Sequence, residues 1–107
     1  MKYAVQITAE AERDLRDIDT YVTAYDAPEK AAYVLAKLEV ACAALESFPL
    51  KGHVPPELER LGLALYREIH FKPYRIIYEV RAKTVFIHAV LDGRRDLQSL
   101  LERRLLR

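Results

Sequence analysis

The spacing of apolar residues changes several times along the chain, and each change predicts a new element. Residues 2–7 alternate between larger apolar and smaller or polar side chains, which predicts a short strand. From residue 9 the apolar positions recur every three or four residues, which predicts a helix ending near Tyr25, with Thr8 as its N-cap. The stripe expected to face a core is Ala11, Leu15, Ile18, Val22 and Tyr25, and the polar face carries Glu12, Arg13, Asp14, Arg16, Asp17 and Asp19.

A second helical pattern follows residues 26–29 and runs to about Ser47. Asp26 can cap this helix, and Pro28 is tolerated in its first turn. Because few residues separate the two helices, they should form an antiparallel hairpin. The single cysteine, Cys42, falls on the apolar stripe, which indicates a buried, unreactive thiol and excludes an internal disulfide. The core-facing positions are Ala31, Val34, Leu35, Leu38, Cys42 and Leu45.

The second half of the chain predicts a sheet. Proline and glycine between residues 48 and 56 indicate a loop, and strand-like segments follow at roughly 64–71, 74–81 and 84–91. Short connections between them favour hairpins and a mainly antiparallel sheet. Helical spacing resumes from Arg94. We therefore expect one α+β domain over residues 1–107 with the order β-α-α-β-β-β-α: a helical hairpin on one face of a mainly antiparallel four-stranded sheet, followed by a C-terminal helix.

Alternation within these strands predicts an open face rich in polar side chains. That face gathers Tyr66, Glu68, His70, Arg75, Glu79 and His88. In the last strand, alternation groups Phe86, His88 and Val90 against Val85, Ile87, Ala89 and Leu91. Such a face could cleave RNA, with Glu68 deprotonating a 2′-hydroxyl, Arg75 neutralising the phosphate and His88 protonating the leaving oxygen. The alternative is a set of cross-strand polar pairs that only stabilises the sheet.

Composition and motifs exclude several classes of function. The chain has one Cys and three scattered His, and it lacks a glycine-rich phosphate loop, a paired-cysteine motif and an HExxH sequence. We therefore expect no metal and no cofactor. No apolar run is long enough to cross a bilayer, and no signal peptide precedes the first strand, so we expect a cytoplasmic protein without a membrane partner.

Charge is distributed unevenly between the two halves. Residues 1–59 carry six Lys and Arg against eleven Asp and Glu, whereas residues 60–107 carry eleven against five. Such polarity favours an anionic partner for the C-terminal half, either nucleic acid or an acidic protein segment. The alternative is a solvated surface on which the two signs have separated without a functional reason.

Several short motifs occur in order along almost the whole chain. They are residues 8–15 (TAEAERDL), Phe48-Pro49 with Gly52, Pro56-Glu57-Leu58, Tyr66-Arg67-Glu68, residues 73–78 (PYRIIY) and Gly93-Arg94-Arg95-Asp96 before a leucine-rich tail. Taken together, these motifs resemble the RelE/ParE family of bacterial toxins from type II toxin-antitoxin systems. The resemblance implies a toxin, used in plasmid stabilisation or stress response, that a cognate antitoxin neutralises in a hetero-oligomeric complex.

The resemblance implies different activities for the two branches of this family. RelE-like members cleave mRNA on the ribosome, and Arg75 matches the arginine that contacts their scissile phosphate, with Glu68 and His88 as candidate proton-transfer groups. These nucleases carry a Tyr or His acid at or after the end of the fourth strand; residues 92–100 contain neither, and His88 lies too early to match it.

The Arg94-Arg95-Asp96 sequence instead resembles the ParE-like branch, whose members poison DNA gyrase by binding rather than by hydrolysis. We therefore predict a gyrase inhibitor whose target-binding residues are Arg94, Arg95, Arg103 and Arg104. Two other interpretations of Arg94 and Arg95 are contact with an acidic antitoxin and simple charge at a helix start, with Asp96 as the N-cap.

Overall fold

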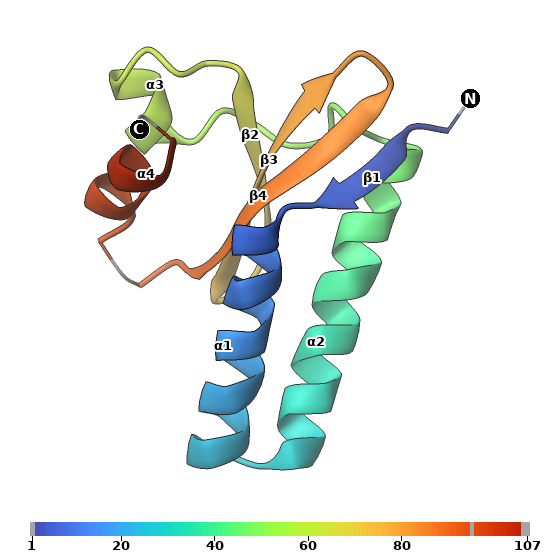
Figure 1. Cartoon of the computed structure of the whole chain (residues 1–107), viewed down its shortest axis with the longest axis vertical. Coiled ribbons are helices and arrows are strands. Elements are labelled where there is room, and N and C mark those ends of the chain that lie inside the picture. Colours follow the sequence, from blue (N-terminus) through green and yellow to red (C-terminus); the bar gives the residue numbers. More distant parts are fainter. Residues whose placement is uncertain (1, 95, 106–107) are drawn as a thin grey trace.

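A four-stranded sheet organises the structure, a computed structural model that describes residues 2–94 and 96–105 (Figure 1). The strand order is β1-β4-β3-β2, with β1 parallel to β4 and the other neighbours antiparallel. The sheet is therefore mainly antiparallel, as predicted. The predicted order of the main elements is also confirmed, and a short helix, α3, is added. The elements are β1 (Ala4–Ile7), α1 (Ala9–Tyr25), α2 (Pro28–Ala43), the 3₁₀ turn η1 (Ala44–Glu46), α3 (Pro56–Arg60), β2 (Tyr66–Phe71), β3 (Tyr74–Arg81), β4 (Thr84–Asp92) and α4 (Leu97–Leu105).

The α1–α2 hairpin covers one face of the sheet and extends beyond it (Figure 1). Thr8 caps α1 as predicted, because its hydroxyl accepts a hydrogen bond from the Ala11 amide at 3.2 Å. The predicted stripe is correct except at its end, where Tyr25 is 78% exposed. Asp14, assigned to the polar face, is instead buried. The core under the hairpin includes Ala11, Ile18, Val22, Ala31, Val34, Leu38, Leu45, Ile76, Tyr78, Val85, Ile87 and Val90.

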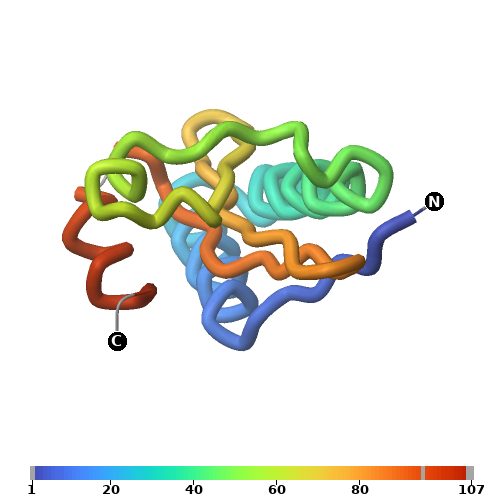
Figure 2. The backbone as a smooth tube through the Cα atoms, turned by 90° about the horizontal axis from the view of Figure 1, so that it is seen from above, coloured from blue at the N-terminus to red at the C-terminus, as the bar shows by residue number. Residues whose placement is uncertain are grey.

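A second core lies on the opposite face of the sheet, where α3 and α4 pack side by side (Figure 2). The face opposite the hairpin, predicted to be open, is therefore partly covered by these two helices. Both helices contribute leucines because one side of each must be buried against Ile77 and the end of β4. This core comprises Leu58, Ile77, Ala89, Leu91, Leu97 and Leu101.

A β-bulge in β4 explains how the strand contributes to both cores. Two consecutive residues of β3 pair with Ala89 and Ile87, so His88 is the extra residue of β4. The bulge shifts the alternation, and the strict pattern predicted for this strand is wrong beyond it. Val90 joins the core under the hairpin, whereas Ala89 and Leu91 join the core under α3 and α4.

The thiol of Cys42 lies within the hairpin-side core, as the sequence predicts. Burial, reinforced by the negative charge of Glu39, raises the pKa of this thiol to about 11. The thiolate is the reactive form, so Cys42 is unsuited to nucleophilic chemistry near neutral pH. Within the described part of the chain, no helix combines the length and apolar character needed to span a bilayer.

Candidate functional site

Arg75 on β3 is held between two carboxylates on the face opposite the hairpin. Its Nε and Nη2 atoms donate to the Glu68 carboxylate at 2.6 and 2.8 Å, and its Nη1 and Nη2 atoms donate to Glu57 of α3 at 2.7 and 2.8 Å. Arg75 was predicted on an open face of the sheet, but only 14% of its side chain is exposed. Hydrogen bonding to Glu57 raises the pKa of Arg75, and the guanidinium stays charged.

Glu68 also binds two histidines at the same site. The Nε2 atom of His70 lies 2.9 Å from Glu68 Oε1, and that of His53 lies 3.3 Å from Oε2. The Glu68 side chain is 1% exposed, whereas those of His53 and His70 are 62% and 42% exposed. A buried carboxylate with this many donors is well satisfied, and we call Glu57, Glu68, Arg75, His53 and His70 together the Arg75 cluster.

A second polar group surrounds Glu79 at the other end of β3. Its carboxylate accepts hydrogen bonds from Arg81 at 2.9 and 3.0 Å and lies 2.9 Å from Nε2 of His88. Burial works to raise the pKa of Glu79, but the hydrogen bonds from Arg81 and His88 outweigh it and lower this pKa. The ring of Tyr66 packs edge-on against His88, with 5.5 Å between the ring centres. We call these four residues the Glu79 cluster.

The three candidate catalytic residues are therefore divided between the two clusters. Glu68 and Arg75 are together, but His88 belongs to the Glu79 cluster. Arg75 and Glu79 are four residues apart on β3, which corresponds to about 13 Å along a strand. Ile77 lies between them on the same strand and is buried under α3 and α4. This arrangement does not place Glu68 and His88 on opposite sides of one phosphate.

The arginines predicted to bind a target differ in their surroundings. Arg94 is bound to Asp92 through two side-chain contacts of 2.9 and 2.6 Å, yet 73% of its side chain is exposed. Arg95 lies outside the described residues. Arg103 is exposed on α4. These roles in target binding stay predictions, with Arg94 and Arg103 open to a partner.

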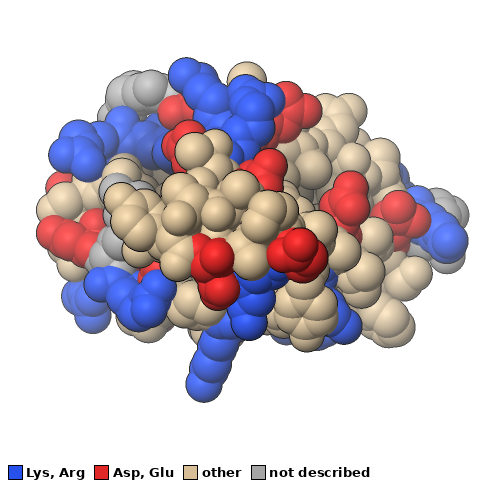
Figure 3. Space-filling view, turned by 90° about the horizontal axis from the view of Figure 1, so that it is seen from below, with Lys and Arg blue, Asp and Glu red and all other residues tan. Residues whose placement is uncertain are grey.

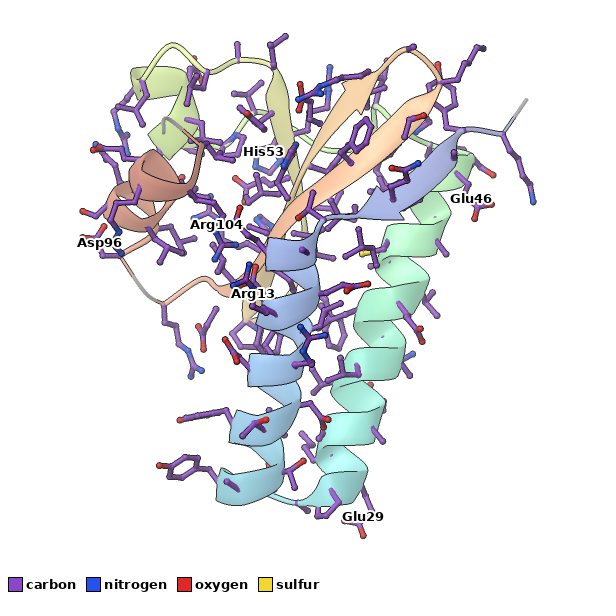
Figure 4. All side chains as sticks on the ribbon, in the orientation of Figure 1. Arg13, Glu29, Glu46, His53, Asp96 and Arg104 are labelled. Carbon is purple, nitrogen blue, oxygen red and sulfur yellow. The ribbon has the colours of Figure 1, made fainter. Side chains whose placement is uncertain are left out.

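Arg104 is engaged inside the protein. Its Nη1 and Nη2 atoms donate to Asp14 of α1 at 2.7 and 3.1 Å, and only 17% of its side chain is exposed. Figure 4 shows Arg104 between α4 and the start of α1. The contact with Asp14 raises the pKa of Arg104. The geometry thus favours a structural role for Arg104.

Asp96 caps α4, as one interpretation of the sequence proposed, because it accepts hydrogen bonds from the Ser99 amide and hydroxyl at 3.4 and 3.1 Å.

Tyrosines line the surface beside the helical hairpin. A hollow of about 420 Å³ between α1 and the ends of β3 and β4 includes Tyr21, Tyr74 and Val90, and a second of about 420 Å³ between the hairpin and the β2–β3 turn also includes Tyr21 and Tyr74. Tyr21, Tyr25 and Tyr33 are each more than half exposed. We call these two hollows the tyrosine surface; such aromatic surfaces are common at protein interfaces.

The face of the molecule seen from below carries charges of both signs. Acidic and basic side chains are interspersed there around uncharged surface (Figure 3).

The sequence pattern did not predict two members of the Arg75 cluster, Glu57 and His53. The Pro55-Pro56-Glu57 sequence is a helix-start signal, and it could have predicted α3 and an acidic first turn. No local signal identifies His53, because it reaches β2 only through a backbone bridge to Glu68.

The Arg75–Glu57 pair makes a prediction about pH. Hydrogen bonding from Arg75 lowers the pKa of Glu57 from 4.5 to about 2, so the carboxylate stabilises the fold above its unfolded pKa. This stabilisation, about 2–3 kcal/mol, should be lost as the pH falls through 4.5 toward about 2. Denaturant unfolding of the wild type and Glu57→Gln should show a difference in free energy that is constant near neutral pH and shrinks below about pH 4.5. A difference independent of pH would contradict the assignment.

Comparisons with known proteins identify the family. A family model described as "ParE toxin of type II toxin-antitoxin system, parDE" matches residues 5–97. A chain of the chromosomal ParDE TA system from P. aeruginosa has a similar fold, with a TM-score of 0.71 and 17% identity over 83% of this chain and 94% of that chain. A chain of the RelBE2 toxin-antitoxin complex from Mycobacterium tuberculosis is similar with a TM-score of 0.58 and 28% identity over 84% of this chain and 96% of that chain. No curated protein sequence matches. Since the family match spans most of the sequence, this chain belongs to the ParE toxin family of type II toxin-antitoxin systems.

Proposed function

We propose that this protein arrests growth by binding DNA gyrase, without hydrolysing nucleic acid. The observation that carries this proposal is the state of Arg75, whose guanidinium is bound on two sides by Glu57 and Glu68. A guanidinium that neutralises a phosphate must offer its donors to that phosphate, and here the carboxylates take them. The ParE family match supports the same target, and a gyrase inhibitor acts in the cytoplasm.

The second candidate is a ribosome-dependent mRNA endoribonuclease. The similarity to a chain of the RelBE2 complex supports it, as does the position of Arg75 beside Glu68. This activity requires Glu57 to release Arg75 and requires a proton donor closer to Glu68 than His88 is. The separation of the two clusters argues against it in the free protein.

A cognate antitoxin is the expected neutralising partner, in a hetero-oligomeric complex. The tyrosine surface offers exposed aromatic anchors along the hairpin, namely Tyr21, Tyr25 and Tyr33. The basic second half of the chain complements an acidic antitoxin segment that folds on binding. Systems of this kind stabilise plasmids or respond to stress, and we propose that residues 1–107 act as the toxin domain in one of them.

Charge reversal at Arg94 and Arg95 tests the proposal. Arg94→Glu combined with Arg95→Glu should abolish growth arrest, because it would replace attraction to an anionic target by repulsion. The matched control is Lys37→Glu, which reverses an exposed charge on α2. Circular dichroism should show the same fold for all three proteins.

Two measurements from one induced culture separate the candidate targets. Gyrase inhibition predicts altered plasmid supercoiling and a DNA-damage response with intact transcripts. Codon-spaced mRNA 5′ ends with normal supercoiling would overturn the proposal in favour of the nuclease. Full toxicity of the double arginine variant, with normal expression, would remove Arg94 and Arg95 from the target-binding surface.

A further inference from the structure

The backbone brings two histidines and a glutamate of the Arg75 cluster onto one face. His53 and Glu68 form an antiparallel bridge, in which the His53 amide donates to the Glu68 carbonyl at 3.2 Å and the Glu68 amide donates to the His53 carbonyl at 2.7 Å. His70 follows Glu68 by two residues on β2, so both side chains lie on the same side of the sheet. Backbone pairing, rather than flexible side-chain contact, therefore places the three groups together.

The donor atoms of these residues have the spacing of a metal site. Within residues 2–94 and 96–105, they are the one group of three or more His, Cys, Asp and Glu residues whose ligand atoms all lie within 4.8 Å of one another. His53 Nε2 lies 3.3 Å from Glu68 Oε2, and His70 Nε2 lies 2.9 Å from Oε1, the other oxygen of the same carboxylate. Zinc bonds of about 2.0–2.1 Å in tetrahedral geometry require ligand atoms about 3.3 Å apart.

The surroundings of Glu68 hold the carboxylate in position. Arg75 donates two hydrogen bonds to it, and Arg75 is itself fixed by Glu57. Such outer contacts orient a metal-binding carboxylate. The positive charge of Arg75 opposes a cation, but the two carboxylates of Glu57 and Glu68 leave the group with a net negative charge when both histidines are neutral.

Access to the site is open. The side chains of His53 and His70 are 62% and 42% exposed, so an ion can reach their Nε2 atoms from solvent. Glu68, at 1% exposed, forms the floor of the site. Two imidazoles and one carboxylate match the preference of zinc, and three protein ligands leave the fourth position for water or a partner's side chain.

We propose that His53, His70 and Glu68 bind a zinc ion through the two Nε2 atoms and one carboxylate oxygen. The ion replaces the contacts that each histidine makes with Glu68. The ion links β2 to the loop that contains His53. Neither gyrase binding nor mRNA cleavage requires this metal site.

Zinc titration of the full chain against a chromophoric chelator tests the proposal. The wild type should bind a single zinc ion per chain, and His53→Ala and His70→Ala should each lower the affinity by about 100-fold or more, because each removes a ligand outright. Neither histidine is buried, so these variants should fold. Cobalt should give the visible absorption of a tetrahedral site in the wild type, and neither variant should show it.

His88→Ala is the matched control. His88 also places Nε2 2.9 Å from a buried carboxylate, that of Glu79, but belongs to the other cluster. Its removal should leave the zinc affinity unchanged. The proposal is overturned if the wild type binds no zinc, if His53→Ala and His70→Ala bind as well as the wild type, or if His88→Ala loses as much affinity as they do.

Discussion

Replacing Asp14 by alanine should lower the free energy of unfolding by about 3–5 kcal/mol, a large part of the stability of a domain this size. Asp14 is buried on α1 and joins three elements. Its carboxylate accepts a hydrogen bond from the Val90 amide of β4 at 2.9 Å and binds both Nη atoms of Arg104 on α4. Its loss leaves a partly buried guanidinium without its main counterion and a buried amide without an acceptor.

The topology of the sheet explains why β4 needs this carboxylate. β1 pairs with β4 only as far as Ile7 opposite Ile87, and the chain then turns into α1. The edge of β4 beyond that point has no β1 partner for the Val90 amide. Asp14, less than two turns into α1, satisfies this donor and at the same time attracts Arg104. Arg104 therefore couples α4 to the rest of the fold.

Equilibrium unfolding in urea, with the wild type as reference, measures this effect. Asp17→Ala is the matched control, because Asp17 is an exposed aspartate on the same helix and should change stability by less than about 0.5 kcal/mol. A double-mutant cycle with Arg104→Ala isolates the ion pair. Equal stabilities for Asp14→Ala and Asp17→Ala would show that Asp14 does not join the three elements.

The burial of Asp14 also shows where sequence reasoning succeeded and where it stopped. The stripe of α1 was predicted because the apolar residues repeat locally, and Asp14 lies three residues after Ala11 and four before Ile18. The spacing therefore places Asp14 on the buried stripe, and it was assigned to the polar face only because its side chain is charged. The partner that makes its burial tolerable is Arg104, 90 residues away, and no local pattern reveals that pairing.

The polar face of the sheet was also predicted only in part, because a local sequence pattern reveals alternation but not long-range contacts. Alternation correctly placed Glu68, Arg75 and Glu79 on the side away from the hairpin, because β2 and β3 alternate without interruption there. The bulge at His88 and the packing of α3 over Arg75 depend on tertiary structure. The prediction of no metal rested on linear spacing and stays a prediction, whereas the zinc proposal rests on the backbone bridge between His53 and Glu68, which brings together residues that are fifteen positions apart.

Gly52→Ala should also be severely destabilising, by about 3 kcal/mol or more. A Cβ atom at this position would collide with the carbonyl oxygen of Glu68 and would lie 2.8 Å from the Tyr78 hydroxyl. The Gly52 amide donates to that hydroxyl at 2.9 Å, and the Gly52 carbonyl accepts from Arg67 at 2.7 Å. The loop cannot move outward to relieve the collision without breaking both bonds.

Two further variants separate the steric collision at Gly52 from two other effects, namely backbone strain at a glycine and loss of the Tyr78 hydroxyl. Gly62 has a φ of 75° and no atoms within 4 Å of an added Cβ, so Gly62→Ala tests backbone strain alone and should cost about 1–2 kcal/mol. Tyr78→Phe removes the hydroxyl without adding a Cβ and should cost about 1–3 kcal/mol, since it leaves the Gly52 amide unsatisfied.

The position of Gly52 before His53 gives the same substitution a second measurable consequence. Displacement of the loop separates the His53 backbone from Glu68, because the bridge between them adjoins the collision. Amide hydrogen exchange at Glu68 should then accelerate in Gly52→Ala and stay slow in Gly62→Ala. If Gly52→Ala is as stable as Gly62→Ala and keeps the Glu68 amide protected, the close approach of the loop to β2 is not what holds His53 in place.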